Sequence, residues 1–462
     1  MKSSDQNNFE VFSHSSFENK LGSSNQALYI YDYLKHFSLK TIIAENKYID
    51  RDYLIDYSKF YARSFNVDQK YTKRYHFFSA PISNDEIFSC LKKCDVDVIK
   101  KLQESYLGFT VIKPVFDKRR NPFIGRTLLK TYETEINGEN RFYLREWYNI
   151  SLFGIPLKIQ TLPFQAQDSA VGGCATSACW VALHPLSSMF GIQKYSPYEL
   201  TDMSVTFPTL SRNFPSTGLT LHQIKSQFNA IGLETEFIDV DKIGQTAPGY
   251  TKNDDIVADA VKAYCNFGLP IIAALRIFKK PTKNRDGKES EKPLYHAVVI
   301  SGYRHKNGKV TELYVHDDQI GPFHRVIPIG NFSDWSNEWV IKHEKERVEV
   351  ERLIVPIYQK FRLNFAYIYS VYLEFKKEVL GDLKSEKVEK DSTIELSLVK
   401  LNDYKKFLLE KSFSDKVDIM TMTFPRFLWV IRYTILGKVK EDDIYDATSV
   451  FPILIKTIEF TD

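Results

Sequence analysis

The chain has 462 residues, of which 43% are hydrophobic and 26% are charged, and its formal net charge is only +4. This length exceeds what one hydrophobic core usually supports, so we expect several domains of an ordinary globular protein. Basic and acidic residues are interspersed, which argues against nucleic-acid or membrane binding. No apolar stretch is long enough to span a bilayer, and the five cysteines show no disulfide framework, so we expect a cytoplasmic location.

The N-terminal 131 residues are predicted to form an accessory region. Residues 1–26 are rich in Ser, Asn and charged residues and lack the apolar segment of a secretory signal, which predicts a flexible N-terminus. Residues 27–131 alternate tyrosine-rich helical stretches with extended runs such as 108–114. This alternation predicts an α/β accessory module.

Residues 132–341 are predicted to be the catalytic domain, and their first part, 132–163, has the pattern of strands. These strands lead to Gln167, whose side-chain amide could donate a hydrogen bond to a developing oxyanion. Gln165 is a weaker candidate for the same role.

Cys174 is predicted to be a nucleophile at the start of a helix. Gly172 and Gly173 precede it and would allow a tight or positive-φ entry, and the apolar run 175–183 follows it. The unpaired N–H groups and the dipole at a helix N-terminus favour an anion, and a neighbouring imidazolium favours the thiolate further.

Cys179 is the competing thiol in the same helix. It lies five residues after Cys174, a rotation of roughly 140°, so the two thiols cannot face the same sheet, and we expect Cys179 to be a core residue. The set of Cys174, Cys179 and His184 does not suit a zinc ion, because five-residue steps splay the ligands around a helix. Pro185 predicts that the helix ends or kinks at His184.

Two more helices and a strand are predicted before the next polar cluster. A capping box opens a helix over 221–231, and a further helix starts at Asp254 or Asp255 and ends before Gly268. The apolar run 270–277 then predicts a buried strand. Helices followed by antiparallel strands predict an α+β domain.

A β-hairpin is predicted next. The strand-like runs 295–303 and 310–316 flank the turn signal 307–308. If that turn has two residues, Lys306 faces Lys309.

The hairpin would bring an imidazole and a carboxylate to one face. In this register His296 lies opposite Gln319 with Asp317 diagonal to it, and a slip of two residues places His296 directly opposite Asp317. Asp318 would point the other way unless the turn has an odd number of residues. We therefore expect Asp317 to orient His296.

Residues 342–462 are predicted to be a mainly helical accessory module. The charged run 342–352 is typical of a linker or a solvated helix, and the stretches 358–379 and 398–411 have helical patterns.

The segment 162–329 resembles the papain-like cysteine peptidase superfamily, and within it the branch typified by bacteriocin-leader (double-glycine) peptidases. The resemblance implies a papain-like core, with a helix bundle packed on an antiparallel sheet. It also implies four roles: oxyanion binding by Gln167, nucleophilic attack by Cys174, general acid–base chemistry by His296 and orientation by Asp317. The chain departs from the pattern at Ala175, where glycine is frequent, at Asp318, where proline is frequent, and in a Gln-to-Cys spacing one residue longer.

The sequence therefore predicts a cysteine peptidase that acts on a protein or peptide through a thioester at Cys174, with no cofactor and no metal. Two alternatives stay open. The same residues could serve a transacylase or deamidase, or the chain could be a non-catalytic papain-like recognition scaffold in a bacterial toxin or defence system. Neither the substrate motif nor the oligomeric state is predicted.

Overall fold

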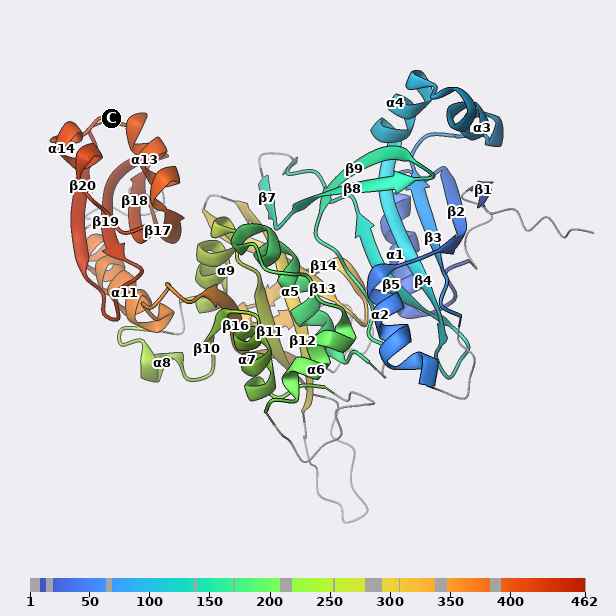
Figure 1. Cartoon of the computed structure of the whole chain (residues 1–462). Helices are drawn as coiled ribbons and strands as arrows, with labels where there is room; N and C mark the ends of the chain where they lie inside the picture. The colour runs from blue at the N-terminus through green and yellow to red at the C-terminus, as the bar shows by residue number, and fades with distance from the viewer. Residues whose placement is uncertain are drawn as a thin grey trace, which may run out of the picture.

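The structure is a computed structural model, and it describes residues 9–13, 20–63, 69–136, 139–168, 171–207, 218–251, 254–278, 293–306, 308–336, 347–382 and 392–461. These residues form helices and antiparallel sheets, so the fold class is α+β. Figure 1 shows a five-stranded sheet on one side of a large nine-stranded sheet and a four-stranded sheet on the other side. In the part of the chain that is described, no helix is both long and apolar enough to cross a membrane.

The N-terminal sheet has the strand order β1-β2-β3-β4-β5. Its strands are β1 (Phe9–Ser13), β2 (Thr41–Tyr48), β3 (Thr72–Phe78), β4 (Tyr106–Phe116) and β5 (Pro122–Leu129). The helices of this part are α1 (Asn25–His36), α2 (Arg51–Lys59), α3 (Asn84–Lys93) and α4 (Val96–Ser105), with a 3-10 turn, η2 (Tyr61–Arg63). The segment 1–26, predicted to be flexible, thus contains a strand, because β1 pairs with β2 at the edge of the sheet.

The hairpin of β8 (Glu146–Leu152) and β9 (Ile155–Thr161) belongs with the N-terminal sheet rather than with the large sheet. Apolar residues of β8 and β9, such as Leu152 and Leu157, share a core with Phe109 of β4 and Leu102 of α4. The strand pattern predicted for 132–163 is present, but these two strands cover the accessory part.

The large sheet contains the histidine and carboxylate predicted from the sequence. Its strands are β6 (Glu135–Ile136), β7 (Glu139–Tyr143), β10 (Leu233–Asp239), β11 (Ile271–Phe278), β12 (Leu294–Lys306), β13 (Lys309–Asp317), β14 (Gly321–Ile329), β15 (Asn331–Ser336) and β16 (Arg347–Tyr358). Because β16 pairs with both β11 and β15, the strands β11 to β16 close into a ring.

Helices accompany this large sheet; those that begin at Cys174, Leu221 and Ile256 lie where the sequence predicts helices, and the other two were not predicted. The helices of this part are α5 (Cys174–Phe190), α6 (Pro197–Ser204), α7 (Leu221–Ala230), α8 (Ile243–Thr246) and α9 (Ile256–Phe267). The capping box of α7 is present, Asp255 caps α9, and Gly268 ends α9 with a φ of 98°.

The predicted end of the first helix at His184 is wrong. Helix α5 continues through Pro185 to Phe190 and ends at Gly191, whose φ is 69°. A proline removes one backbone hydrogen bond and costs about 3 kcal/mol, but residues on both sides of it, such as Trp180 and Leu186, are buried. Their burial outweighs the local cost.

The hairpin register follows the prediction in which Lys306 faces Lys309. One bulge lies in each strand, and the two compensate, so that Val299 still faces His316 as an unbroken ladder would have it. Of the two predicted turn residues, Asn307 lies outside the described residues and Gly308 has a φ of 76°.

The C-terminal region is not mainly helical. It carries α11 (Phe365–Asp382), α13 (Leu401–Leu409) and α14 (Lys416–Thr421), but also a sheet of β17 (Ser392–Lys400), β18 (Phe427–Ile435), β19 (Lys438–Asp446) and β20 (Leu454–Glu459). The charged run 342–352 is no linker in its described part, because residues from Arg347 onward form β16 in the centre of the large sheet. Alternate residues of β16, such as Val348 and Val350, are buried, and the charges point outward.

One hydrophobic core joins all three parts. It includes Ile30 of α1, Trp180 of α5, Val299 of β12, Leu396 of β17 and Tyr445 of β19. The accessory parts are therefore packed against the large sheet rather than merely tethered to it.

Candidate active site

Cys174 is the first residue of α5, and its side chain is half-buried. No side chain in the described residues caps this end of the helix, so the N–H groups of the first turn stay available to an anion. Of the tight or positive-φ entry that the two glycines would allow, the positive-φ form is not adopted, because Gly173 is extended with φ −77° and Gly172 also lacks a positive φ.

His296 lies near the start of β12, and its side chain is buried. Its Nε2 is 2.9 Å from Oδ1 of Asp317, the last residue of β13. The tautomer with the proton on Nε2 donates to this carboxylate and leaves the Nδ1 lone pair for a second group.

Cys174 is the group that completes this set. Burial lowers the pKa of His296, but the charge and hydrogen bond of Asp317 and a hydrogen bond with the Cys174 thiol raise it well above the ordinary value. The structure thus brings together the thiol, the imidazole and the carboxylate predicted from the sequence. They come from α5, β12 and β13.

The neighbouring carboxylate, Asp318, does not point away as predicted. Its Oδ1 lies 3.8 Å from His296 Nε2, because β13 ends at Asp317 and the strand alternation no longer applies in the turn that follows. Burial and the charge of Asp317 raise the pKa of Asp318 to about 7, although His296 opposes this. For Asp317 the charge and hydrogen bond of His296 outweigh burial, so its pKa is lowered.

Gln319 lies in the turn after β13, where its side chain reaches His296, but sequence reasoning gave it no role. Its side-chain Nε2 lies 3.4 Å from His296 Nδ1, and its backbone N–H donates to Asp317 Oδ1 at 2.9 Å. Gln319 therefore fixes the carboxylate of Asp317 and lies beside the ring nitrogen of His296 that does not face Asp317.

Helix α1 supports the turn that carries these groups. Gln26 donates from Nε2 to the backbone oxygen of Asp318 at 2.9 Å. The ring of Tyr29 covers Gly321 so closely that a Cβ on this glycine would lie 2.0 Å from Tyr29 Cδ1. The close approach requires glycine here.

The two glutamines ahead of the thiol differ in exposure. Gln167 is half-buried in the loop before α5, and Gln165 is buried. The hydrogen bonds that join the described groups around His296 do not include Gln167, so its oxyanion role stays a prediction.

Cys179 is a core residue, as predicted. It is 1% exposed, and burial raises the pKa of its thiol. His184 packs against Trp180 with ring centroids 4.5 Å apart, and its Nδ1 lies 3.0 Å from the Tyr148 hydroxyl. These two contacts give His184 a structural role in the core.

Asp168 is a functional residue that sequence reasoning missed. Its Oδ1 accepts hydrogen bonds from the backbone N–H groups of Val171 at 2.8 Å and Gly172 at 3.0 Å, directly ahead of Cys174. Its Oδ2 accepts from the Tyr61 hydroxyl at 2.9 Å and lies 3.7 Å from Lys113 Nζ. The accessory part thus fixes the loop that leads to the thiol.

Lys113 of β4 is fully enclosed between two acids. Its Nζ lies 3.9 Å from Asp56 Oδ2, and burial raises the pKa of Asp56 to about 8 despite the charge of Lys113. Near neutral pH Asp56 is mostly protonated, so Lys113 serves chiefly as the counter-ion of Asp168. A lone lysine in the apolar run 108–114 was the sequence signal for this network.

His296, Asp317 and Asp318 also form a group that could hold a metal ion, since one ligand atom from each lies within 4.8 Å of the others. Neither carboxylate oxygen of Asp318 has a hydrogen-bond partner in the described part of the chain. A metal at Nε2 would displace the proton shared with Asp317 and remove the base. The two uses of these residues exclude each other.

No protein-family model matches the chain, and no curated protein matches it.

Proposed function

We propose that this chain is a cysteine peptidase with a papain-like core, which hydrolyses a peptide bond in a protein or peptide. The observation that carries the proposal is the convergence of Cys174 at a helix N-terminus with His296, whose other ring nitrogen meets Asp317 at 2.9 Å. A thiol needs a base beside it and an orienting group behind that base, and these are the roles that this geometry supports.

The reaction follows from the positions of these atoms. The Cys174 sulfur attacks the carbonyl carbon of the scissile bond, and its proton passes to His296 Nδ1. The imidazolium, stabilised by Asp317, protonates the leaving amine as the C–N bond breaks, which leaves a thioester. Water then gives a proton to His296, attacks the thioester and releases the acid and the thiol.

The oxyanion that forms in both steps needs donors. The backbone N–H groups at the start of α5 are free of a side-chain cap, and the Gln167 amide is the side-chain donor predicted from the sequence. Removal of one such donor lowers kcat by about 10²–10³ in other acyl-transfer enzymes. We expect a Gln167→Ala variant to fall in that range.

A thiol-directed activity probe tests the proposal. The probe should label the wild-type protein and Cys179→Ala, and it should fail to label Cys174→Ala. Cys179 is the matched control because it lies in the same helix but is buried. Absence of labelling in wild type would favour a non-catalytic scaffold, and loss of labelling in Cys179→Ala would contradict the choice of nucleophile.

Mass spectrometry of a proteome incubated with the protein separates the enzymatic alternatives. A peptidase creates new N-termini, a deamidase changes side-chain amides without new termini, and a transacylase joins an amine to the acyl group. New termini that disappear with Cys174→Ala are the expected result. Products of the other two kinds would reassign the reaction while keeping the nucleophile.

A further inference from the structure

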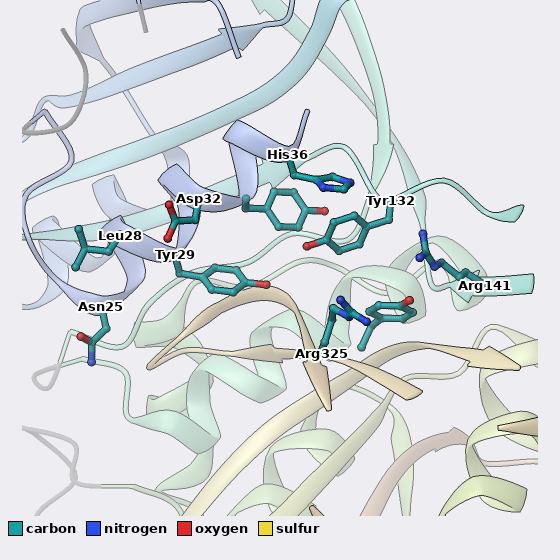
Figure 2. A pocket seen from close by; sticks show the side chains of 10 residues that line it. Asn25, Leu28, Tyr29, Asp32, His36, Tyr132, Arg141 and Arg325 are labelled. Atoms are coloured by element: carbon teal, nitrogen blue, oxygen red, sulfur yellow. The ribbon is translucent and has the colours of Figure 1, made fainter. Parts of the chain in front are cut away.

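A cavity of about 460 Å³ lies between α1 and the outer face of the large sheet. Six side chains from five segments dominate its wall: Tyr29 and Tyr33 from α1, Tyr132, Arg141 from β7, Tyr314 from β13 and Arg325 from β14. Figure 2 shows Tyr29, Tyr132, Arg141 and Arg325 around one space. The volume lies in the range of small-molecule sites.

Cys174, His296 and Asp317 do not line this cavity, although Tyr29 in its wall also covers Gly321, the strand partner of Asp317. Tyr314 precedes Asp317 by three residues, about 10 Å along an extended strand, and an odd step places the two side chains on opposite faces of the sheet. The cavity therefore calls for an explanation of its own.

Aromatic rings line the middle of the cavity. The ring centroids of Tyr33 and Tyr132 are 4.9 Å apart, and Tyr132 is 6.2 Å from Tyr314. Tyr33 and Tyr314 are buried, whereas Tyr29 and Tyr132 are only half-buried and keep ring surface open. Such surfaces stack on planar rings, including nucleic-acid bases.

Positive charge is concentrated at one end. Arg141 has no acidic partner within the described residues, its Nη1 reaches only the backbone oxygen of Glu133 at 3.3 Å, and its Nε is buried without a partner there. Arg325 binds Glu312 through Nε, yet its side chain is 57% exposed. Glu312 also pairs with Arg304 at 3.0 Å, and Arg304 has a second acidic partner in Glu139 at 3.1 Å, so the exposed Arg325 shares its carboxylate while Arg141 has none in the described residues.

The other end offers acceptor groups instead. Figure 2 shows Asn25, Leu28 and Asp32 away from the two arginines, which flank Tyr132. Asp32 is 76% exposed, and its nearest cation is Lys35 at 3.7 Å. A ligand that matches the cavity has an anion at the arginine end, a planar ring in the middle and a hydrogen-bond donor at the Asn25 and Asp32 end.

We infer that this cavity binds a nucleotide, with the base stacked among the tyrosines, an exocyclic amine or ring N–H toward Asp32, and phosphate on Arg141 and Arg325. Guanidinium groups suit phosphate because their donors match two oxygens at once. The inference does not depend on the proposed peptidase function, because it concerns binding on the opposite face of the sheet.

Isothermal titration calorimetry with the full chain and AMP, GMP, CMP and UMP tests this inference. We expect saturable binding of at least one of the four, and binding at least about tenfold weaker for adenosine and for inorganic phosphate alone, because each half forgoes the stacking or the charged hydrogen bonds. Phosphotyrosine carries ring and phosphate without the base and serves as the non-nucleotide comparison.

Variants locate the binding. Arg141→Gln and Tyr132→Leu should each weaken the best nucleotide about tenfold or more. Arg120→Gln, an exposed cation between β4 and β5 outside this cavity, should leave it unchanged, as should Cys174→Ala. If Arg141→Gln fails to fold, the more exposed Arg325→Gln replaces it.

Four results would overturn the inference. They are no nucleotide binding tighter than about 1 mM, phosphate binding as tightly as the nucleotides, binding of phosphotyrosine but of no nucleotide, or unchanged nucleotide affinity in a folded arginine variant. Probe labelling at Cys174 is measured on the same samples, so failure here is distinguished from failure of the peptidase proposal.

Discussion

Asp317 and Asp318 are adjacent and equally buried, yet they should affect stability with opposite dependence on pH. The pKa of Asp318 is raised from 3.8 to about 7, mainly by burial. A carboxyl group with a higher pKa in the folded than in the unfolded chain binds its proton more tightly when folded. Its stabilising effect is complete below the unfolded pKa and is lost as the pH rises through about 7.

The size of this effect follows from the shift. The pKa of Asp318 is higher by about three in the folded chain, and each step of one in pKa corresponds to about 1.4 kcal/mol. The cost of ionising Asp318 in the folded protein is therefore at most about 4 kcal/mol. Asp318→Asn stays neutral at every pH and escapes this cost. Relative to wild type, the free energy of unfolding of this variant should therefore rise from pH 4 to pH 8 by at most about 4 kcal/mol.

Urea unfolding followed by tryptophan fluorescence, at several values between about pH 4 and pH 8, measures the difference. Asp317→Asn is the matched control, because the pKa of Asp317 is lowered by His296 and its contribution is present above the unfolded pKa and lost toward acid. That variant should lose stability at neutral pH. If Asp318→Asn gained nothing at pH 8, the ionised carboxylate would have to be stabilised by a bound cation, and the metal use of this site would gain support.

Three further predictions concern the surroundings of the thiol. Lys113→Met should lower the free energy of unfolding by about 3–5 kcal/mol in urea titrations, because it leaves the buried Asp168 without its counter-ion; a loss under about 1 kcal/mol would contradict the network. Gly321→Ala should lower stability by about 1–3 kcal/mol, and Tyr29→Ala in the same chain should recover most of that loss in a double-mutant cycle, whereas additive losses would refute the contact. Dialysis against EDTA should leave peptidase turnover unchanged, and a loss restored by added metal would reject the thiol mechanism.

Much of the site could be predicted because the hairpin obeys a simple parity. The turn signal fixed Lys306 opposite Lys309, and this register put His296, Asp317 and Gln319 on neighbouring positions. Each of the two bulges shifts the strand register, and either one alone would have made the prediction wrong. It survived because the bulges lie on different strands and compensate each other.

At Asp318 and Pro185, predictions from local sequence rules fail. Parity assumes a continuing strand, and β13 ends at Asp317, so the side chain of Asp318 turned toward His296 instead of away. The rule for Pro185 assumes that the helix gains little beyond its own hydrogen bonds, whereas α5 is buried along most of its length. The end of a strand decided the first position and tertiary packing the second, and local rules account for neither.

The contact between Lys113 and Asp168 could not be predicted, because the two residues lie on separate parts of the chain and neither belongs to a motif. What the sequence offers is a charge inside an apolar strand, which implies a buried partner without naming it.

The N-terminal part therefore belongs to the site rather than to its periphery. Asp52 of α2 accepts a hydrogen bond from Trp180 in the middle of α5 at 3.0 Å, Lys113 neutralises the acid that shapes the loop before Cys174, and Gln26 holds the turn after Asp317. A module that only recruited substrate would not need charges buried against α5, since each costs free energy unless its partner is present. Both ends of the set formed by Cys174, His296 and Asp317, the thiol loop and the carboxylate turn, thus depend on the same accessory sheet and its helices for their geometry.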